Sequence, residues 1–176
     1  NGWKIMEGDI YRSNVLRDKA KNATILLCNP PFENFTPKEQ DDSKTAGEQL
    51  KFYNKAAEML WRTLPFMPEE SVFGVILPQG FLHKKNLAKL RETILRDFEL
   101  SQLCTLPENV FTFAGHMSAL LLGRKRIARS KRSNDNEVLY RHVPKKGLER
   151  FKEKYEAQDQ CVVQSKFDKG PAFEMR

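Results

Sequence analysis

The sequence predicts an α/β fold, because strand-like and helix-like patterns alternate along the chain. Two short unbroken apolar runs, at residues 23–28 and 71–77, end in polar or proline-rich residues, which is typical of strands buried on both faces. Between and after these runs, apolar residues recur every three or four positions, as they do along amphipathic helices. Because parallel strands need helical crossovers, this alternation predicts a largely parallel sheet with helices on both faces.

The helical patterns fall into two stretches. The first ends at Pro65, which cannot continue a helix, and its apolar stripe consists of Leu50, Tyr53, Ala57, Leu60 and Leu64. The second runs over residues 83–97, with a stripe formed by Leu87, Leu90, Ile94 and Phe98. Both stretches are long enough to cross from one strand to the next.

Further strands follow the second helix. Residues 100–106, 117–122 and 137–143 have strand-like patterns, and residues 147–158 have the composition of a charged helix. Residues 3–6 form one more candidate strand, which ends at an acidic turn containing Asp9. In open α/β sheets, ligands bind outside the carboxyl ends of the strands. We therefore expect Asp9, residues 29–32 and residues 78–81 to lie along one rim.

The composition excludes several classes of protein. In the 176-residue chain, 12 Phe, 4 Tyr and 2 Trp supply enough apolar surface for a core, which argues against disorder. The longest apolar runs are far shorter than the ~20 residues that cross a bilayer. The three cysteines include no CxxC pair, so reduced thiols in a cytoplasmic protein are expected rather than a disulfide framework or a zinc site.

Positive charge is concentrated in the C-terminal part. Residues 1–123 carry 15 basic and 15 acidic side chains, whereas residues 124–154 carry 12 basic and 4 acidic ones. This shift suggests a boundary between residues 1–125 and a basic extension, 126–176, built as a strand plus a charged helix. The densest cluster could follow a phosphate backbone or could be a solvated loop between two strands; it comprises Arg124, Lys125, Arg126, Arg129, Lys131 and Arg132.

The most specific motif follows the first apolar run directly. It reads Asn29-Pro30-Pro31-Phe32, and two adjacent prolines fix the backbone of the turn. One interpretation is a rigid turn that ends the strand and plugs a gap in the core with its aromatic ring. The other is a functional turn that holds polar atoms toward a ligand.

This tetrad resembles the Asn/Asp-Pro-Pro-aromatic motif of S-adenosylmethionine-dependent amino-methyltransferases, in particular the N6-adenine DNA methyltransferases. Residues 74–82 resemble the next strand in the modification subunits of restriction systems, and residues 106–111 and 118–122 resemble their later strand pair. Gly8-Asp9-Ile10 occupies the place of the acidic turn that meets the cofactor adenine. The resemblance covers residues 3–125 and implies a Rossmann-like methyltransferase sheet.

The resemblance also implies roles for individual residues. The Asn29 side-chain oxygen and the Pro30 carbonyl would accept the two N–H groups of an adenine amine, which lowers the barrier as the nitrogen becomes tetrahedral. Phe32 would stack on a base rotated out of the duplex, with Phe111, or else Phe113, on its other side. Asp9 and Ile10 would contact the cofactor. The reaction needs no metal.

Part of the family pattern is absent from this sequence. The family places a Gly-rich turn after its first strand, but no two of the nine glycines here are spaced for a G-x-G turn; they stand at positions 2, 8, 47, 74, 80, 115, 123, 147 and 170. We therefore expect a sheet that is incomplete on its N-terminal side, in a fragment that binds cofactor poorly and is inactive alone.

The leading hypothesis is N6-adenine methylation of DNA within a restriction-modification system, with DNA and a specificity or restriction subunit, or fused domains, as partners. An RNA methyltransferase or a protein-glutamine methyltransferase would use a similar tetrad, usually ending in Tyr. A third alternative is a non-catalytic DNA-binding remnant.

Overall fold

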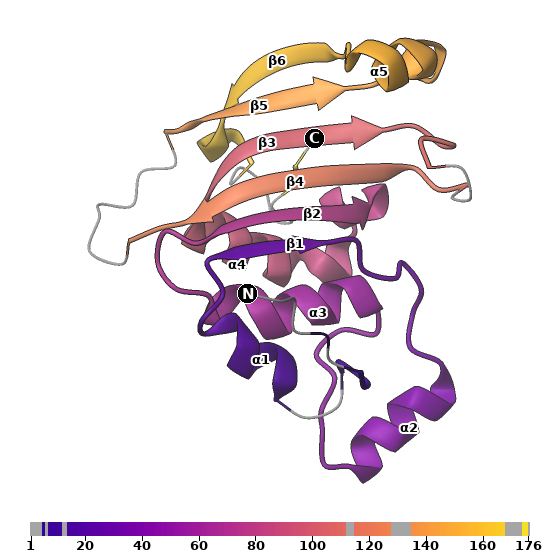
Figure 1. Cartoon of the computed structure of the whole chain (residues 1–176), viewed down its shortest axis with the longest axis vertical. Helices are drawn as coiled ribbons and strands as arrows, with labels where there is room; N and C mark the ends of the chain where they lie inside the picture. Colours follow the sequence, from indigo (N-terminus) through magenta and orange to yellow (C-terminus); the bar gives the residue numbers. More distant parts are fainter. Residues whose placement is uncertain are drawn as a thin grey trace.

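The computed structural model describes residues 5, 7–11, 14–111, 115–127, 135–167 and 174–175. Within these residues the chain forms one six-stranded open sheet in the order β1-β2-β4-β3-β5-β6 (Figure 1). The strands are β1 (Ile25–Cys28), β2 (Val72–Pro78), β3 (Phe98–Leu106), β4 (Ser118–Lys125), β5 (Glu137–His142) and β6 (Gln158–Val163). The α-helices are α1 (Val15–Ala20), α2 (Pro37–Thr45), α3 (Lys55–Thr63), α4 (Ala88–Asp97) and α5 (Leu148–Lys154).

Strand directions in the sheet are mixed. β1 pairs with β2 and β3 with β5 in parallel, whereas β2 with β4, β4 with β3, and β5 with β6 are antiparallel. The expectation of a largely parallel sheet is therefore wrong. β3 and β4 are joined by residues 107–117, a connection too short for a helical crossover, so β4 runs back between β2 and β3.

The main core lies between one face of the sheet and helices α3 and α4. Alternate residues of β2, Phe73, Val75 and Leu77, point to this face and are at most 2 % exposed. They meet Leu60 of α3 and Ile94 of α4, both fully buried, so the predicted helical stripes are confirmed as core. The first helix is shorter than its stripe, because Asn54 caps it and leaves Leu50 and Tyr53 outside.

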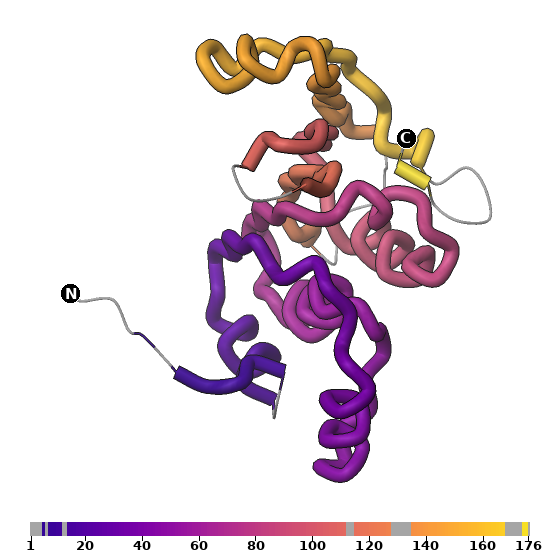
Figure 2. Tube along the Cα trace, turned by 90° about the vertical axis from the view of Figure 1, so that its right-hand side faces the viewer, coloured from indigo at the N-terminus to yellow at the C-terminus, as the bar shows by residue number. Residues whose placement is uncertain are grey.

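The opposite face is covered unevenly. Figure 2 shows α5 and α4 on opposite sides of the sheet. α5 supplies Phe151 to a small second cluster formed by Cys104, Leu106 and Val143. Toward β1 the same face is bare: Leu27 is 76 % exposed and Ile25 62 %.

The C-terminal segment continues the sheet instead of standing apart from it. The residues expected as a strand plus a charged helix contain β5 and α5, and also β6, which the sequence pattern did not reveal. Gln164 and Phe167, which follow β6, are buried against the main core. Of the strand expected over residues 3–6, Ile5 alone is described, and it is exposed and outside any strand.

Candidate active site

The turn after β1 carries the tetrad at the carboxyl rim of the sheet. The Asn29 residue is exposed, Pro30 is buried, and Phe32 is half-buried. Among the described residues, none forms a hydrogen bond with the Asn29 side chain or the Pro30 carbonyl. Phe32 is not part of the buried core, whereas Phe35, at 5 % exposure, is. The turn thus has two acceptor oxygens without a partner in the described part of the chain, close to an aromatic ring with solvent access.

The residues after the tetrad are tied to the start of α3. The Asn54 side chain donates a hydrogen bond to the Phe32 carbonyl at 2.9 Å, and the Lys55 N–H donates to the Glu33 carbonyl at 3.0 Å. The Phe35 N–H donates to the carbonyl of Tyr53 at 2.8 Å. Residues 32–35 and residues 53–55, about 20 positions apart in the chain, are therefore hydrogen-bonded to each other directly beside the turn. We call this pairing the junction.

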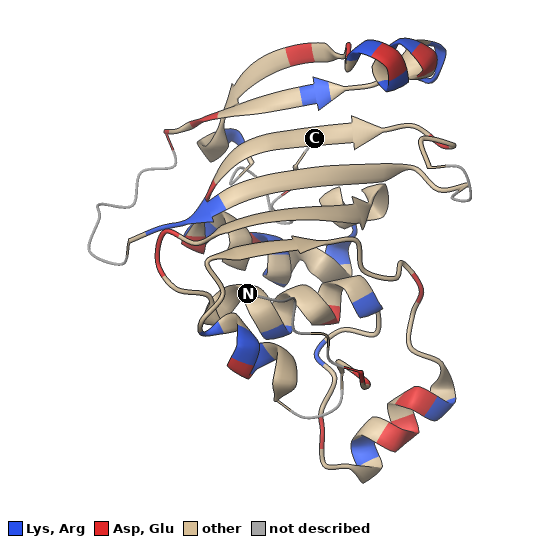
Figure 3. Cartoon of the chain, in the orientation of Figure 1, with Lys and Arg blue, Asp and Glu red and all other residues tan. Residues whose placement is uncertain are grey.

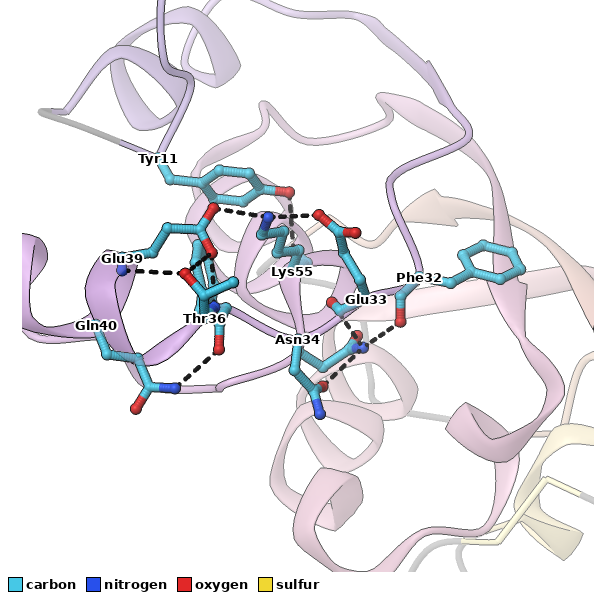
Figure 4. A network of polar contacts seen from close by, with 10 residues as sticks. Tyr11, Phe32, Glu33, Asn34, Thr36, Glu39, Gln40 and Lys55 are labelled. Carbon is cyan, nitrogen blue, oxygen red and sulfur yellow. Dashed lines mark hydrogen bonds and ion pairs between the residues drawn. The ribbon is translucent and has the colours of Figure 1, made fainter.

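A buried lysine adds charge to this junction. Lys55, whose side chain is 11 % exposed, forms ion pairs of 2.5 Å with Glu33 and 2.8 Å with Glu39 (Figure 4). Hydrogen bonds to Glu33 and Glu39 raise the pKa of Lys55. The hydrogen bonds that Glu39 accepts from Lys55 and from Thr36 lower the pKa of Glu39 to about 2. Thr36 and Glu39 also form a capping box that starts α2.

The predicted cofactor turn lies next to the same junction. The Asp9 carboxylate accepts a hydrogen bond from the Tyr11 N–H at 2.9 Å, and Ile10 is 42 % exposed. The Tyr11 ring packs edge-on against Phe35 with ring centres 4.9 Å apart, and its hydroxyl donates to the Lys55 carbonyl at 3.2 Å. The structure thus connects the turn at Asp9 to the segment that follows the tetrad.

Tyr11 gives this junction a testable dependence on alkaline pH. Burial raises the pKa of Tyr11 to about 12. The folded state holds the phenol proton more tightly than the unfolded state does. The neutral phenol therefore contributes fully to the free energy of unfolding below pH 10, and this contribution is lost as the pH rises toward 12. Between pH 9 and 11.5, we expect the free energy of unfolding to fall by about 1 kcal/mol more in the wild type than in Tyr11→Phe. The expected difference is this small because the Tyr11 side chain is only half-buried, and solvent weakens the effect of burial on its pKa.

Urea unfolding at a series of pH values measures this difference. Tyr53→Phe is the matched control, since Tyr53 is 63 % exposed and its variant should follow the wild-type curve. Parallel curves for the wild type and Tyr11→Phe would show that the phenol is not held in its neutral form.

Other predicted residues lie along the same rim. β2 ends at Pro78 beside Ser118, and the Gln79 N–H donates to the Met117 carbonyl at 3.0 Å. Phe111, in the connection after β3, is 37 % exposed, so it is not a core residue. A cavity of about 240 Å³ opens nearby between Gln79, Met117 and the ends of β3 and β5. Within the described residues, no group of three or more His, Cys, Asp or Glu side chains could hold a metal ion.

The described residues of the basic cluster lie at the opposite end of the strands from the tetrad. β4 runs antiparallel to β2, so Arg124 and the residues after it stand at the end farthest from the tetrad, as the blue end of β4 in Figure 3 shows. Lys125 donates to two backbone carbonyls at 2.7 and 2.6 Å, and burial lowers its pKa. Arg126, whose side chain is 6 % exposed, pairs with Glu99 at 3.2 Å. These contacts give Lys125 and Arg126 structural roles.

Several predicted residues fall outside the part of the chain that the structure describes. They are Phe113, Arg129, Lys131 and Arg132.

The chain was compared with family models, with curated proteins and with solved structures. No family model and no curated protein matches the chain. Solved structures do match: a type I restriction-modification methyltransferase subunit from Streptococcus thermophilus has a TM-score of 0.59 at 14 % identity, over 91 % of this chain and 38 % of that one. The chain has a methyltransferase fold.

Further structures share this methyltransferase fold. A modification subunit of a putative type I restriction enzyme from Vibrio vulnificus gives a TM-score of 0.53 at 17 % identity, over 78 % of this chain and 33 % of that one. A putative class I S-adenosylmethionine-dependent methyltransferase from Listeria monocytogenes gives 0.51 at 15 % identity, over 68 % and 36 %. The chain thus spans about a third of the length of these proteins.

The residues that bond to the tetrad and to the segment after it were not predicted from the sequence. Asn54 and Lys55 were hidden inside the expected helix, although an Asn before a run with helical spacing is a known N-cap signal. Their partners Glu33 and Glu39 carry no periodic signal. Contacts across about 20 residues could be found only from the fold.

Proposed function

We propose that this chain is part of a restriction-system DNA methyltransferase that transfers a methyl group from S-adenosylmethionine to the N6 amine of a flipped adenine. The observation that carries the proposal is the turn after β1, where two acceptor oxygens without described partners stand at the rim of a methyltransferase fold. DNA and a subunit or domain that reads the target sequence are the partners this function requires.

The chemistry follows from the nucleophile. The lone pair of the adenine amine is delocalised into the ring, so the amine gains reactivity when its two N–H groups are held as the nitrogen becomes tetrahedral. In the proposed role, Asn29 Oδ1 and the Pro30 carbonyl accept these two N–H groups. The proline rings fix the turn before the substrate arrives. When bound, S-adenosylmethionine would supply the methyl group to this nitrogen with its thioether as the leaving group, and the amine would release one of the two protons that Asn29 and Pro30 hold.

The aromatic residues would hold the base. Phe32 is half-buried, which leaves part of its ring accessible to a purine that has left the duplex. Phe111, exposed in the connection after β3, is the proposed partner on the opposite side. Stacking on both faces recovers part of the few kcal/mol spent on unstacking the base.

We further propose that most of the cofactor site lies outside these residues. S-adenosylmethionine would supply the methyl group, and the described chain offers it one acidic turn, Asp9 and Ile10, without a Gly-rich turn in the sequence. The bare sheet face beside β1 supports this proposal, because sheets with parallel βα connections are normally covered on both faces. Further strands and helices would cover it and complete the sheet.

Calorimetric titration tests the division of the cofactor site. We expect S-adenosylmethionine to bind the 176-residue chain with a Kd above about 1 mM, a binding free energy weaker than about −4 kcal/mol. A longer protein that includes a Gly-rich turn should bind at least 100-fold more tightly. Micromolar binding by the short chain would contradict the proposal.

The basic cluster at residues 124–132 would bind the DNA backbone. Arg124, with a side chain 56 % exposed and ion-paired to Glu70 and Glu99 at its surface, is the most accessible of its described members. Lys125 bonds to backbone carbonyls and Arg126 pairs with Glu99, so these two side chains could contact DNA only after those bonds break. Together with Arg129, Lys131 and Arg132, this segment would touch DNA away from the flipped base.

Sequencing of modified DNA tests the whole proposal. The full-length protein is expressed in a bacterial host without its own methyltransferases, and its DNA is read by a method that detects modified bases. We expect N6-methyladenine at one recurring sequence. Methyl groups found in RNA or on protein glutamine, or DNA binding without any methyl transfer, would favour the alternatives.

A further inference from the structure

The turn after β1 is fixed at its far end by a side chain of another element. Pro30 and Pro31 lack N–H groups, so the turn cannot donate hydrogen bonds of its own at these two positions. The first backbone group after β1 with a described partner is the Phe32 carbonyl, which accepts from Asn54 Nδ2 at 2.9 Å. Asn54 therefore makes the first described hydrogen bond to the tetrad along the chain.

The Asn54 side chain is itself held rigidly. Its Oδ1 accepts a hydrogen bond from the Ala57 N–H at 3.1 Å and thereby caps α3. The Ala57 N–H can bond only to the Asn54 oxygen, and the Phe32 carbonyl can bond only to the Asn54 nitrogen. These two partners therefore fix the orientation of the Asn54 carboxamide. The same Nδ2 lies 3.4 Å from the Glu33 carbonyl and 3.4 Å from Asn34 Oδ1. The amide thus links the first turn of a core helix to the tetrad.

We propose that Asn54 is a positioning residue, which holds Phe32 and the proline carbonyls in the geometry that the flipped base requires. This inference rests on the proposed function for its effect on catalysis. Asn54 does not touch the base. It acts through the Phe32 carbonyl, and α3 transmits the rigidity of the core to the turn.

Two variants separate positioning from helix capping. Asn54→Asp and Asn54→Ser both keep an oxygen that caps α3. An ionised Asp has no donor, and the Ser hydroxyl stands one bond nearer the backbone than the Asn54 amide nitrogen, so it stops short of the Phe32 carbonyl. The matched control is Thr36→Ala, which removes the cap of α2 in the same loop and leaves the Phe32 carbonyl with its donor. An effect of lost helix stability alone would appear in Thr36→Ala and not in the two Asn54 variants.

Kinetics on the full-length protein measure the effect on catalysis. We expect kcat for DNA methylation to fall about 10- to 100-fold in both Asn54 variants, as displacements near 1 Å can cost 100-fold. The KM for DNA should change less than about threefold, because Asn54 makes no contact with the substrate. Thr36→Ala should keep the wild-type kcat. If the Asn54 variants also keep it, the inference is wrong.

Hydrogen exchange on the same proteins tests the positioning without any assay of activity. The backbone amides of Phe35 and Lys55, which donate to the Tyr53 and Glu33 carbonyls beside the turn, should exchange faster in the Asn54 variants than in the wild type or Thr36→Ala. Unchanged exchange there would overturn the inference. If the wild-type protein methylates no adenine, the proposed function fails, and the exchange data still decide whether Asn54 holds the turn.

Discussion

Asn29→Ala is expected to reduce the kcat of adenine methylation by about 100- to 1,000-fold, the range seen when one stabilising group is removed from the site of a developing charge. Alanine keeps the backbone of the turn and removes the amide oxygen that would accept one N–H of the adenine. The Pro30 carbonyl would still hold the other N–H. The KM for DNA should change little, because the lost bond strengthens as the nitrogen becomes tetrahedral.

The same substitution should leave the fold intact. Asn29 is exposed, and its side chain has no hydrogen-bond partner among the described residues, so the free energy of unfolding should change by less than about 0.5 kcal/mol. Asn22→Ala is the matched control, since Asn22 is exposed near the other end of β1 and bonds through its backbone N–H. Methylation by purified Asn29→Ala at the wild-type rate would rule out the proposed mechanism.

Gln164→Leu is expected to lower the free energy of unfolding by about 3–5 kcal/mol, the largest stability effect we expect from a single substitution here. Gln164 is fully buried after β6. Its Oε1 accepts from the Leu100 N–H at 2.7 Å and from Asn136 at 2.9 Å, and its Nε2 donates to the carbonyls of Leu95 and Phe98 at 3.1 and 2.9 Å. Leucine has a similar volume but would leave all four groups without this partner.

Thermal and urea unfolding measure the loss. Gln160→Leu, on the exposed part of β6, is the control for the added hydrophobic side chain and should change the free energy of unfolding by less than about 0.5 kcal/mol. A Gln164→Leu protein as stable as the wild type would mean that these bonds contribute nothing net. The result also measures how firmly the C-terminal segment is joined to the main core.

Local patterns in the sequence predicted much of the fold. The apolar runs that became β1 and β2 and the stripes that became α3 and α4 were found because burial leaves a periodic record in the chain. Strand direction leaves no such record. The reversal at residues 107–117 put β4 between β2 and β3, and no periodicity in β4 distinguishes that placement from a parallel one.

For the candidate site, the sequence predicted the tetrad but not what holds it. The tetrad is contiguous, so its residue types can be read directly. Asn54 bonds to Phe32, Lys55 to Glu33 and the Tyr11 ring packs on Phe35, each across more than 20 positions. Gln164 bonds to residues more than 60 positions away. The density of positive charge likewise did not show that Lys125 and Arg126 are used inside the fold.

The uncovered end of the sheet has a consequence for handling the isolated chain. β1 pairs with β2 along one side, and no other described strand pairs with it, so its outer edge offers unpaired backbone groups next to Leu27 and Ile25. Natural edge strands usually carry a lysine, a proline or a bulge that discourages addition of another strand. β1, Ile-Leu-Leu-Cys, has none of these. At high concentration, two copies of this chain would be prone to self-association and precipitation through this edge.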